Sequence, residues 1–232
     1  DGPGIRFVVF LSGCPLRCVY CHNPDTWDKH SGKEMTAEEI VIKAKRYKPY
    51  FSGGGGITLS GGEPFMQPEF VSGIMSRCRE EGISTCADTG AGIFNSKVRE
   101  ALSHTDLVLL DIKHTEPRKY RELTGGSIET QRAFFDYCKS INMPLWIRRV
   151  VFPDTSKEDI YALMEYIQGA DVKKIELLPY HTLGISKWEA LGLRYKLGRL
   201  APPPEELMKE LRGIVGGSEI ENTAREIQMS GK

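Results

Sequence analysis

The sequence lacks the features that would place it in several large classes of protein. Its 31 Lys and Arg residues balance 31 Asp and Glu residues, so the basic excess of a dedicated nucleic-acid-binding domain is missing. No apolar run approaches the ~20 residues that a membrane-spanning helix needs. Six cysteines in 232 residues are too few and too unevenly placed for a disulfide-stapled scaffold. What remains is an ordinary globular chain, long enough for one sizeable domain, and we expect a cytoplasmic location.

Short β-branched runs alternate with segments of helical period. The expected strands are Phe7–Leu11, Ile57–Ser60, Ile83–Ala87, Leu107–Ile112, Leu145–Val151 and Lys174–Leu178. Helices are expected from Thr36 and over Pro68–Glu81, Ser96–Ser103, Glu129–Ser140, Ser156–Gln168 and Pro204–Gly213. This alternation predicts an α/β fold with parallel strands and right-handed crossovers. We assign residues 1–215 to this domain and 216–232 to a C-terminal tail, whose weak periodicity predicts no structure.

The chemically distinctive residues fall at or just after the ends of these strands. They are, in strand order, Cys14–Cys21, Gly61-Gly62-Glu63, Asp88-Thr89, Asp111 with Lys113, Arg148 and His181. In a parallel barrel the carboxyl ends of the strands converge on one mouth, where active sites lie. The pattern therefore predicts one site built from all six strands.

Three of the cysteines, Cys14, Cys18 and Cys21, have the spacing C-x3-C-x2-C. Thiolates suit iron–sulfur clusters or zinc. Three thiolates on one tight loop can hold three irons of a cubane and leave the fourth open to a substrate. The alternative is a structural zinc site completed by His22 or a distant cysteine, although adjacent ligands at 21 and 22 make poor tetrahedral geometry.

The other cysteines, Cys78, Cys86 and Cys138, lie in amphipathic helices or on a strand and are expected to be small core residues. The segment Ser60–Pro64 ends a strand with two glycines, which allow close approach of a ligand to the backbone but also suit an ordinary turn.

Charged residues close otherwise apolar strands at Asp88, Asp111 and Lys113. Such residues need a ligand or a partner, and a salt bridge across the barrel mouth is the alternative to a binding role. Arg148 and Arg149 alternate in direction along a strand, so one of them should point inward, where it can clamp a carboxylate. By itself, His181 is better explained as a hydrogen-bonded loop histidine than as a binding residue.

Together these residues resemble a known family. The cysteine loop with an aromatic residue before its last cysteine is similar to the signature of radical S-adenosylmethionine (SAM) enzymes. The segments Asp1-Gly2-Pro3-Gly4-Ile5-Arg6 and Cys21-His22-Asn23 resemble those of the activating enzymes of glycyl-radical enzymes. Trp146-Ile147-Arg148, Leu177–His181 and Lys187-Trp188 extend the resemblance, which runs from Asp1 to about Ile214.

The resemblance implies a partial β/α barrel of six parallel strands, a [4Fe–4S] cluster on Cys14, Cys18 and Cys21, and SAM as cofactor. It places Tyr20, Cys21 and His22 along SAM, Gly62 at its amino group, and His181 at its ribose. Asp111, Ile112 and Lys113 would line the SAM pocket together with Arg148. Asp88, Thr89 and Asp111 match positions that can hold a monovalent cation.

The resemblance also implies partners. The protein substrate would be a glycyl-radical enzyme, and the electron donor a flavodoxin or ferredoxin. Only about fifteen residues separate Cys21 from the helix at Thr36, so the ferredoxin-like insertion of the dehydratase-type branch is absent and pyruvate formate-lyase is the expected substrate. Two alternatives stay open, namely another glycyl-radical enzyme as substrate and a non-catalytic, zinc-stabilised binding protein.

Overall fold

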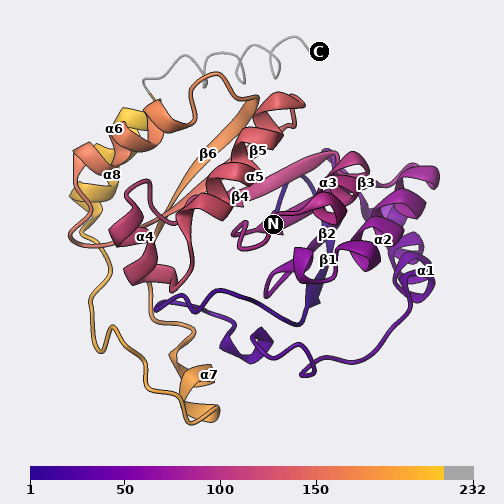
Figure 1. Cartoon of the computed structure of the whole chain (residues 1–232), viewed down its shortest axis with the longest axis horizontal. Coiled ribbons are helices and arrows are strands. Elements are labelled where there is room, and N and C mark those ends of the chain that lie inside the picture. Colours follow the sequence, from indigo (N-terminus) through magenta and orange to yellow (C-terminus); the bar gives the residue numbers. More distant parts are fainter. Residues whose placement is uncertain (217–232) are drawn as a thin grey trace.

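A computed structural model describes residues 1–216, whose centre is one curved parallel sheet (Figure 1). Its strands are β1 (Arg6–Leu11), β2 (Gly56–Gly61), β3 (Ser84–Thr89), β4 (Leu107–Asp111), β5 (Leu145–Val151) and β6 (Val172–Pro179). They are ordered β1 to β6 as in the sequence, and each pairs with the next in parallel. Within the described chain β6 does not pair with β1, so the sheet is an open six-stranded partial barrel, as predicted.

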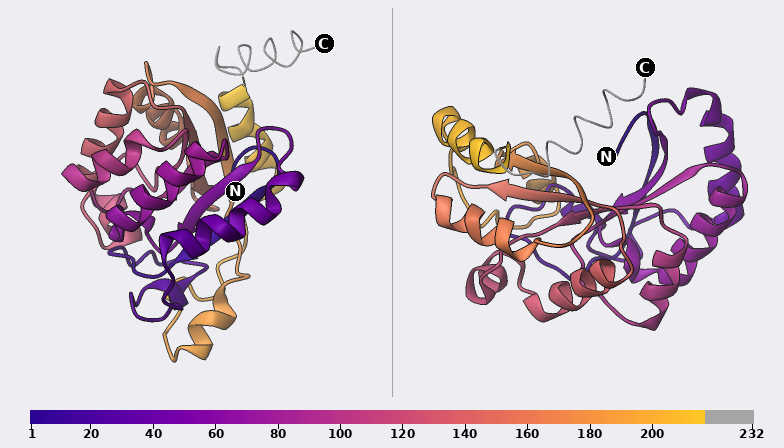
Figure 2. Two further views of the ribbon diagram at one scale, coloured as in Figure 1. Left: turned by 90° about the vertical axis from the view of Figure 1, so that its right-hand side faces the viewer. Right: turned by 90° about the horizontal axis from the view of Figure 1, so that it is seen from above.

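The main helices cover the convex face of the sheet (Figure 2). They are α1 (Ala37–Tyr47), α2 (Pro68–Glu80), α3 (Ser96–Ser103), α5 (Ile128–Ser140), α6 (Lys157–Tyr166) and α8 (Glu205–Gly216). Capping boxes at Thr36 with Glu39 and at Ser156 with Asp159 start α1 and α6 where the sequence signals place them. The largest core cluster packs between the sheet and these helices.

Two short α-helices are additional to those expected, α4 (Pro117–Thr124) and α7 (Ile185–Ala190), as are three short 3-10 helices at Pro24–Thr26, Lys48–Tyr50 and Pro64–Met66. Helix α4 buries only Tyr120 and Thr124, and helix α7 buries only Trp188. Neither helix therefore has the continuous apolar face by which a helix is recognised in a sequence.

The predicted domain boundary falls at the end of α8, which packs against α6 and β6. Of the predicted tail, residues 217–232 lie outside the described residues. None of the helices formed by residues 1–216 is long and apolar enough to cross a bilayer.

Candidate active site

The carboxyl ends of the six strands surround a cavity of about 400 Å³. All but one of the predicted site residues line it, namely Cys14, Cys18, Tyr20, Cys21, His22, Gly62, Asp88, Thr89, Asp111, Lys113, Arg148 and His181. The exception is Ile112, whose side chain is fully buried in the core. Asp111 and Lys113 line the cavity on either side of it, because successive side chains alternate at the end of β4.

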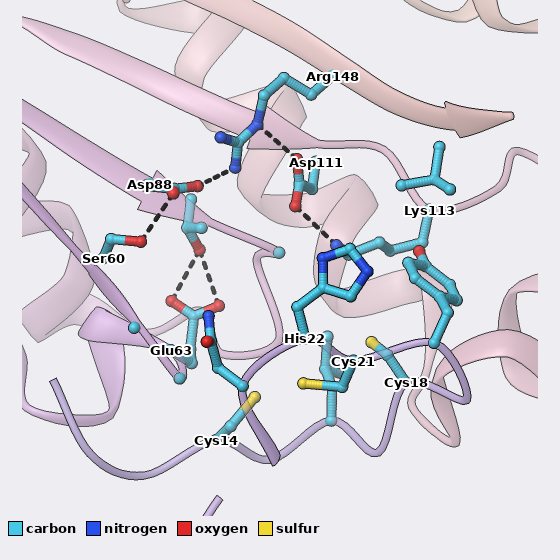
Figure 3. Close-up of a pocket in the computed structure, with 18 of the residues that line it drawn as sticks. Cys14, Cys18, Cys21, His22, Ser60, Glu63, Asp88, Asp111, Lys113 and Arg148 are labelled. Atoms are coloured by element: carbon cyan, nitrogen blue, oxygen red, sulfur yellow. Dashed lines mark hydrogen bonds and ion pairs between the residues drawn. The ribbon is translucent and has the colours of Figure 1, made fainter. Parts of the chain in front are cut away.

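The cysteine loop is fixed at the cavity wall by backbone hydrogen bonds. The amide of Gly13 donates to Thr26 O at 2.7 Å, Arg17 N donates to Thr124 O at 2.7 Å, and Val19 N donates to Leu123 O at 2.9 Å. Arg17 also folds back on its own loop, where its guanidinium donates to the carbonyl oxygen of Cys14 at 2.6 Å. The three thiols are therefore carried on a rigid support (Figure 3).

A later part of the chain holds the same loop from the other side. The indole N–H of Trp188 donates to the carbonyl oxygen of Cys21 at 2.8 Å, and Lys187 Nζ donates to Asn23 Oδ1 at 2.8 Å. Both residues belong to α7, so this short helix locks the end of the cysteine loop. The sequence resemblance included Lys187-Trp188 but gave no contact for them.

The cysteines are unpaired thiols in a poorly solvated place. Burial raises the pKa of Cys14 to about 12 and that of Cys18 to about 11, and it also raises the pKa of Cys21. The thiols therefore keep their protons at neutral pH until a metal displaces them.

A multi-iron cluster fits this donor set better than one zinc ion. Within residues 1–216 no group of three His, Cys, Asp or Glu side chains is placed to hold a single ion, so the three thiols do not surround one point. His22, the fourth ligand in the zinc alternative, instead faces His181. The Nε2 atom of His22 lies 3.2 Å from the backbone carbonyl oxygen of His181, and the two imidazole rings stack with their centroids 4.2 Å apart. The isolated cysteines are fully buried away from the cavity.

Four charged side chains face the thiols across the cavity (Figure 3). The register of β4 and β5 puts Asp111 beside Arg148, whose Nε lies 2.7 Å from Asp111 Oδ1, and the same guanidinium forms an ion pair with Asp88. Lys113 Nζ lies 2.6 Å from Asp111 Oδ2. Burial opposes the ionisation of Asp111, but Arg148 and Lys113 overcome it and lower its pKa to about 2. The salt-bridge network that the sequence left as an alternative is thus present.

A buried carboxylate that the sequence reading did not assign lies beside this network. Glu63 is 1% exposed, and its two carboxylate oxygens lie 2.7 and 2.8 Å from the Thr89 hydroxyl, which donates its one proton to them. Glu63 also accepts from Phe65 N at 3.2 Å. Burial raises its pKa to about 7. The sequence signal for Glu63 was its position directly after Gly61 and Gly62, where β2 ends.

The residues predicted to share a cation make separate contacts in this structure. The Thr89 hydroxyl is bonded to Glu63, whereas Asp88 and Asp111 are bridged by Arg148.

Gly62 is required by packing. A Cβ at this position would collide with the carbonyl oxygen of Gly13 and lie 2.9 Å from that of Thr26. The turn after β2 and the cysteine loop can approach each other only because residue 62 has no side chain.

Comparison with known proteins gives a consistent result. Residues 8–167 match the model of the radical SAM superfamily. The chain is 51% identical to the pyruvate formate-lyase-activating enzyme of Clostridium pasteurianum over 91% of this chain and 90% of the relative. It is 43% identical to the pyruvate formate-lyase 1-activating enzyme of Escherichia coli K12 over 93% of this chain and 90% of the relative.

Solved structures share the fold. SuiB of Streptococcus suis superposes with a TM-score of 0.73 at 17% identity over 95% of this chain, which spans 47% of SuiB. A domain of the pyruvate formate-lyase-activating enzyme of Bacteroides vulgatus gives a TM-score of 0.57 at 24% identity, over 69% of this chain and 92% of that domain. With these matches over most of its length, the chain belongs to the radical SAM superfamily and, within it, to the family of pyruvate formate-lyase-activating enzymes.

Proposed function

We propose that this protein activates pyruvate formate-lyase. SAM takes up one electron and its sulfonium C–S bond breaks, which gives methionine and a 5′-deoxyadenosyl radical. That radical takes a hydrogen atom from the Cα of one glycine of the partner, which yields 5′-deoxyadenosine and the glycyl radical. The observation that carries the proposal is one cavity lined by three free cysteines and a buried charged cluster, in a protein of this family.

The family implies a [4Fe–4S] cluster, which supplies the electron and, at its open iron, a place for SAM. Cys14, Cys18 and Cys21 would hold it. Their support by Trp188 and by the backbone of residues 123–124 keeps the three thiols in place before the metal arrives.

The remaining site residues suit a zwitterionic nucleoside. Lys113 offers a positive charge to the methionyl carboxylate, and Asp111 offers a negative charge to the methionyl amino group. Arg148 holds Asp111 in place. Gly62 lines the same cavity beside the cysteine loop. On the other side, Tyr20 and the stacked rings of His22 and His181 give flat surfaces for the adenosine. A monovalent cation at Asp88, Thr89 and Asp111 would share both aspartates with Arg148, which bridges them.

The open side of the barrel suits a protein substrate. Phe10 of β1 is 55% exposed and Leu178 of β6 is 37% exposed, and both line the cavity at the two unpaired edges of the sheet. A loop that carries a glycine can pass between these edges and cover apolar surface as it does so.

The direct test is transfer of a labelled hydrogen. Reduced enzyme, SAM and pyruvate formate-lyase deuterated at its glycine Cα are mixed without oxygen. We expect a glycyl-radical signal by electron paramagnetic resonance and deuterium in the 5′-deoxyadenosine. If deuterium were transferred only from another glycyl-radical enzyme, that enzyme would be the protein substrate, and the proposed radical reaction would stand. Zinc in place of iron by elemental analysis, with no SAM cleavage, would refute the proposal.

We further propose a flavodoxin or ferredoxin as the electron donor, docked over a basic strap made of residues 191–200. Tyr195, Leu197 and Leu200 of this strap pack against the cysteine loop. The basic side chains of the strap, Arg194, Lys196 and Arg199, are exposed, and residues 191–204 contain no acidic side chain. Acidic one-electron carriers would be attracted to this surface beside the cluster loop. The free thiols and the need for such a carrier support a cytoplasmic location.

Charge reversal on the strap tests this. Lys196→Glu combined with Arg199→Glu is expected to slow reduction by flavodoxin by about tenfold at low salt, because steering of an acidic partner is lost. Reduction by dithionite, a small chemical reductant, should be unchanged in the same variant. Equal slowing with both reductants would mean that the strap supports the cluster loop and does not receive the donor.

A further inference from the structure

A second cavity of about 360 Å³ lies behind the cysteine loop and shares no lining residue with the first. Its apolar wall is formed by Val19, Leu123, Phe152, Leu197 and Leu200. Arg149 lines it from β5, next to Arg148, which faces the other cavity. Arg148 and Arg149 thus line different cavities on the two sides of β5.

Arg149 is buried without a counter-ion. The residue is 4% exposed, and within residues 1–216 its only hydrogen bond runs from Nη1 to Ile112 O at 3.2 Å. Its Nε–H is buried without an acceptor, and no salt bridge joins it to a carboxylate of residues 1–216. A guanidinium stays charged in proteins, and a buried charge without a partner is costly. Burial lowers the pKa of Arg149, which reflects this cost.

The other charged groups of this cavity already have partners. Lys119 Nζ lies 3.1 Å from Asp159 Oδ1, and His114 Nε2 lies 3.3 Å from the same oxygen. His114 Nδ1 accepts from Glu116 N at 3.0 Å, so its ring proton is on Nε2. Burial, aided by the charge of Arg149, lowers the pKa of His114 to about 4, and the ring is neutral at pH 7.

Of the two cations that line the cavity, Lys119 pairs with Asp159, whereas Arg149 forms no salt bridge within residues 1–216. His114 carries no charge at pH 7. Two exposed carboxylates line the same cavity, Glu122, which is paired with Arg118, and Asp154. A ligand with one negative charge would pair directly with the Arg149 guanidinium, whereas a dianion would meet stronger repulsion from these carboxylates.

We propose that this cavity binds a small organic monocarboxylate, whose carboxylate pairs with Arg149 and whose apolar part lies against Phe152, Leu197 and Leu200. The volume is in the range of small-molecule sites. The planar guanidinium matches a carboxylate bidentately. Such a ligand would touch Val19 between Cys18 and Cys21, and also the basic strap, so it would hold the cysteine loop from behind. This site is independent of the proposed activity.

The test is ligand binding to the full chain, purified without oxygen. Calorimetry with acetate, butyrate and hexanoate should show saturable binding that strengthens from acetate to butyrate. Butanol, which lacks the charge, and inorganic phosphate, which carries more, should bind at least about tenfold more weakly. Butyrate should also raise the melting temperature.

Arg149→Met keeps the length of the side chain and removes the charge. It should weaken butyrate binding by about tenfold or more, while the unliganded variant melts no lower than wild type, because the charge it loses was unpaired. Arg118→Met, at an exposed position beside the cavity, is the matched control and should bind butyrate normally. Should Arg149→Met not fold, Leu200→Trp fills the cavity with Arg149 intact and should block butyrate.

Three results would overturn the proposal. The first is no saturable binding of any of the acids to wild-type protein. The second is unchanged butyrate affinity in Arg149→Met or in Leu200→Trp. The third is phosphate binding more tightly than butyrate.

Discussion

Cys18→Ala is expected to abolish SAM cleavage and to remove most of the bound iron. The residue is 9% exposed and lies in the middle of the cysteine loop, with its thiol facing the cavity (Figure 3). A cubane held by three protein thiolates loses a third of its protein ligands with this change, and no cysteine beyond Cys14, Cys18 and Cys21 lines the cavity to replace the lost one. Cys14→Ala and Cys21→Ala should behave alike.

Cys78→Ala is the matched control. This thiol is also fully buried, but it lies in α2 within the main core, so its loss should leave iron content and cleavage intact. The measurements are iron per chain after anaerobic reconstitution and 5′-deoxyadenosine formed per minute. Full iron content in Cys18→Ala would contradict the assignment of the cluster ligands.

Where the signal was local, the sequence predicted which side chains would converge at the ends of the strands. Parallel strands end at one edge, so polar residues that close apolar strands had to meet there, and Asp88, Asp111 and Lys113 do. Alternation along β5 required Arg148 and Arg149 to face opposite sides, and they line different cavities. Both rules depend only on the period of a strand.

Contacts between distant segments could not be read in this way. Trp188 reaches the carbonyl oxygen of Cys21 across 167 positions, from a helix with no apolar stripe. Glu63 and Thr89 pair across 26 positions, and nothing in either segment indicates that the threonine hydroxyl serves a buried carboxylate. Ile112 was included with its neighbours by resemblance, although strand alternation turns it into the core.

The two arginines of β5 should respond in opposite ways to the same substitution. Arg148→Met removes the cation that bridges Asp88 and Asp111, whereas Arg149→Met removes a cation that bridges nothing. Breaking a buried ion pair by deleting one partner costs about 3–5 kcal/mol, because the other charge is left behind. Asp111 keeps Lys113, but Asp88 keeps only the hydroxyl of Ser60, at 2.7 Å. The cost should therefore fall mainly on Asp88.

Arg148→Met is accordingly expected to lower the free energy of unfolding by about 3 kcal/mol and to weaken SAM binding, since Asp111 loses the group that fixes it. The change in the free energy of unfolding is measured by urea unfolding at pH 7, with wild type and variant at equal iron content. Asp88→Asn in the same chain should restore much of the lost stability, because a neutral amide can still accept from Ser60 and leaves no buried charge. SAM affinity should remain low in this double variant, since Asp111 is still unsupported. A loss below about 1 kcal/mol in Arg148→Met, or no recovery with Asp88→Asn, would show that the bridge between the two aspartates does not hold this mouth of the barrel together.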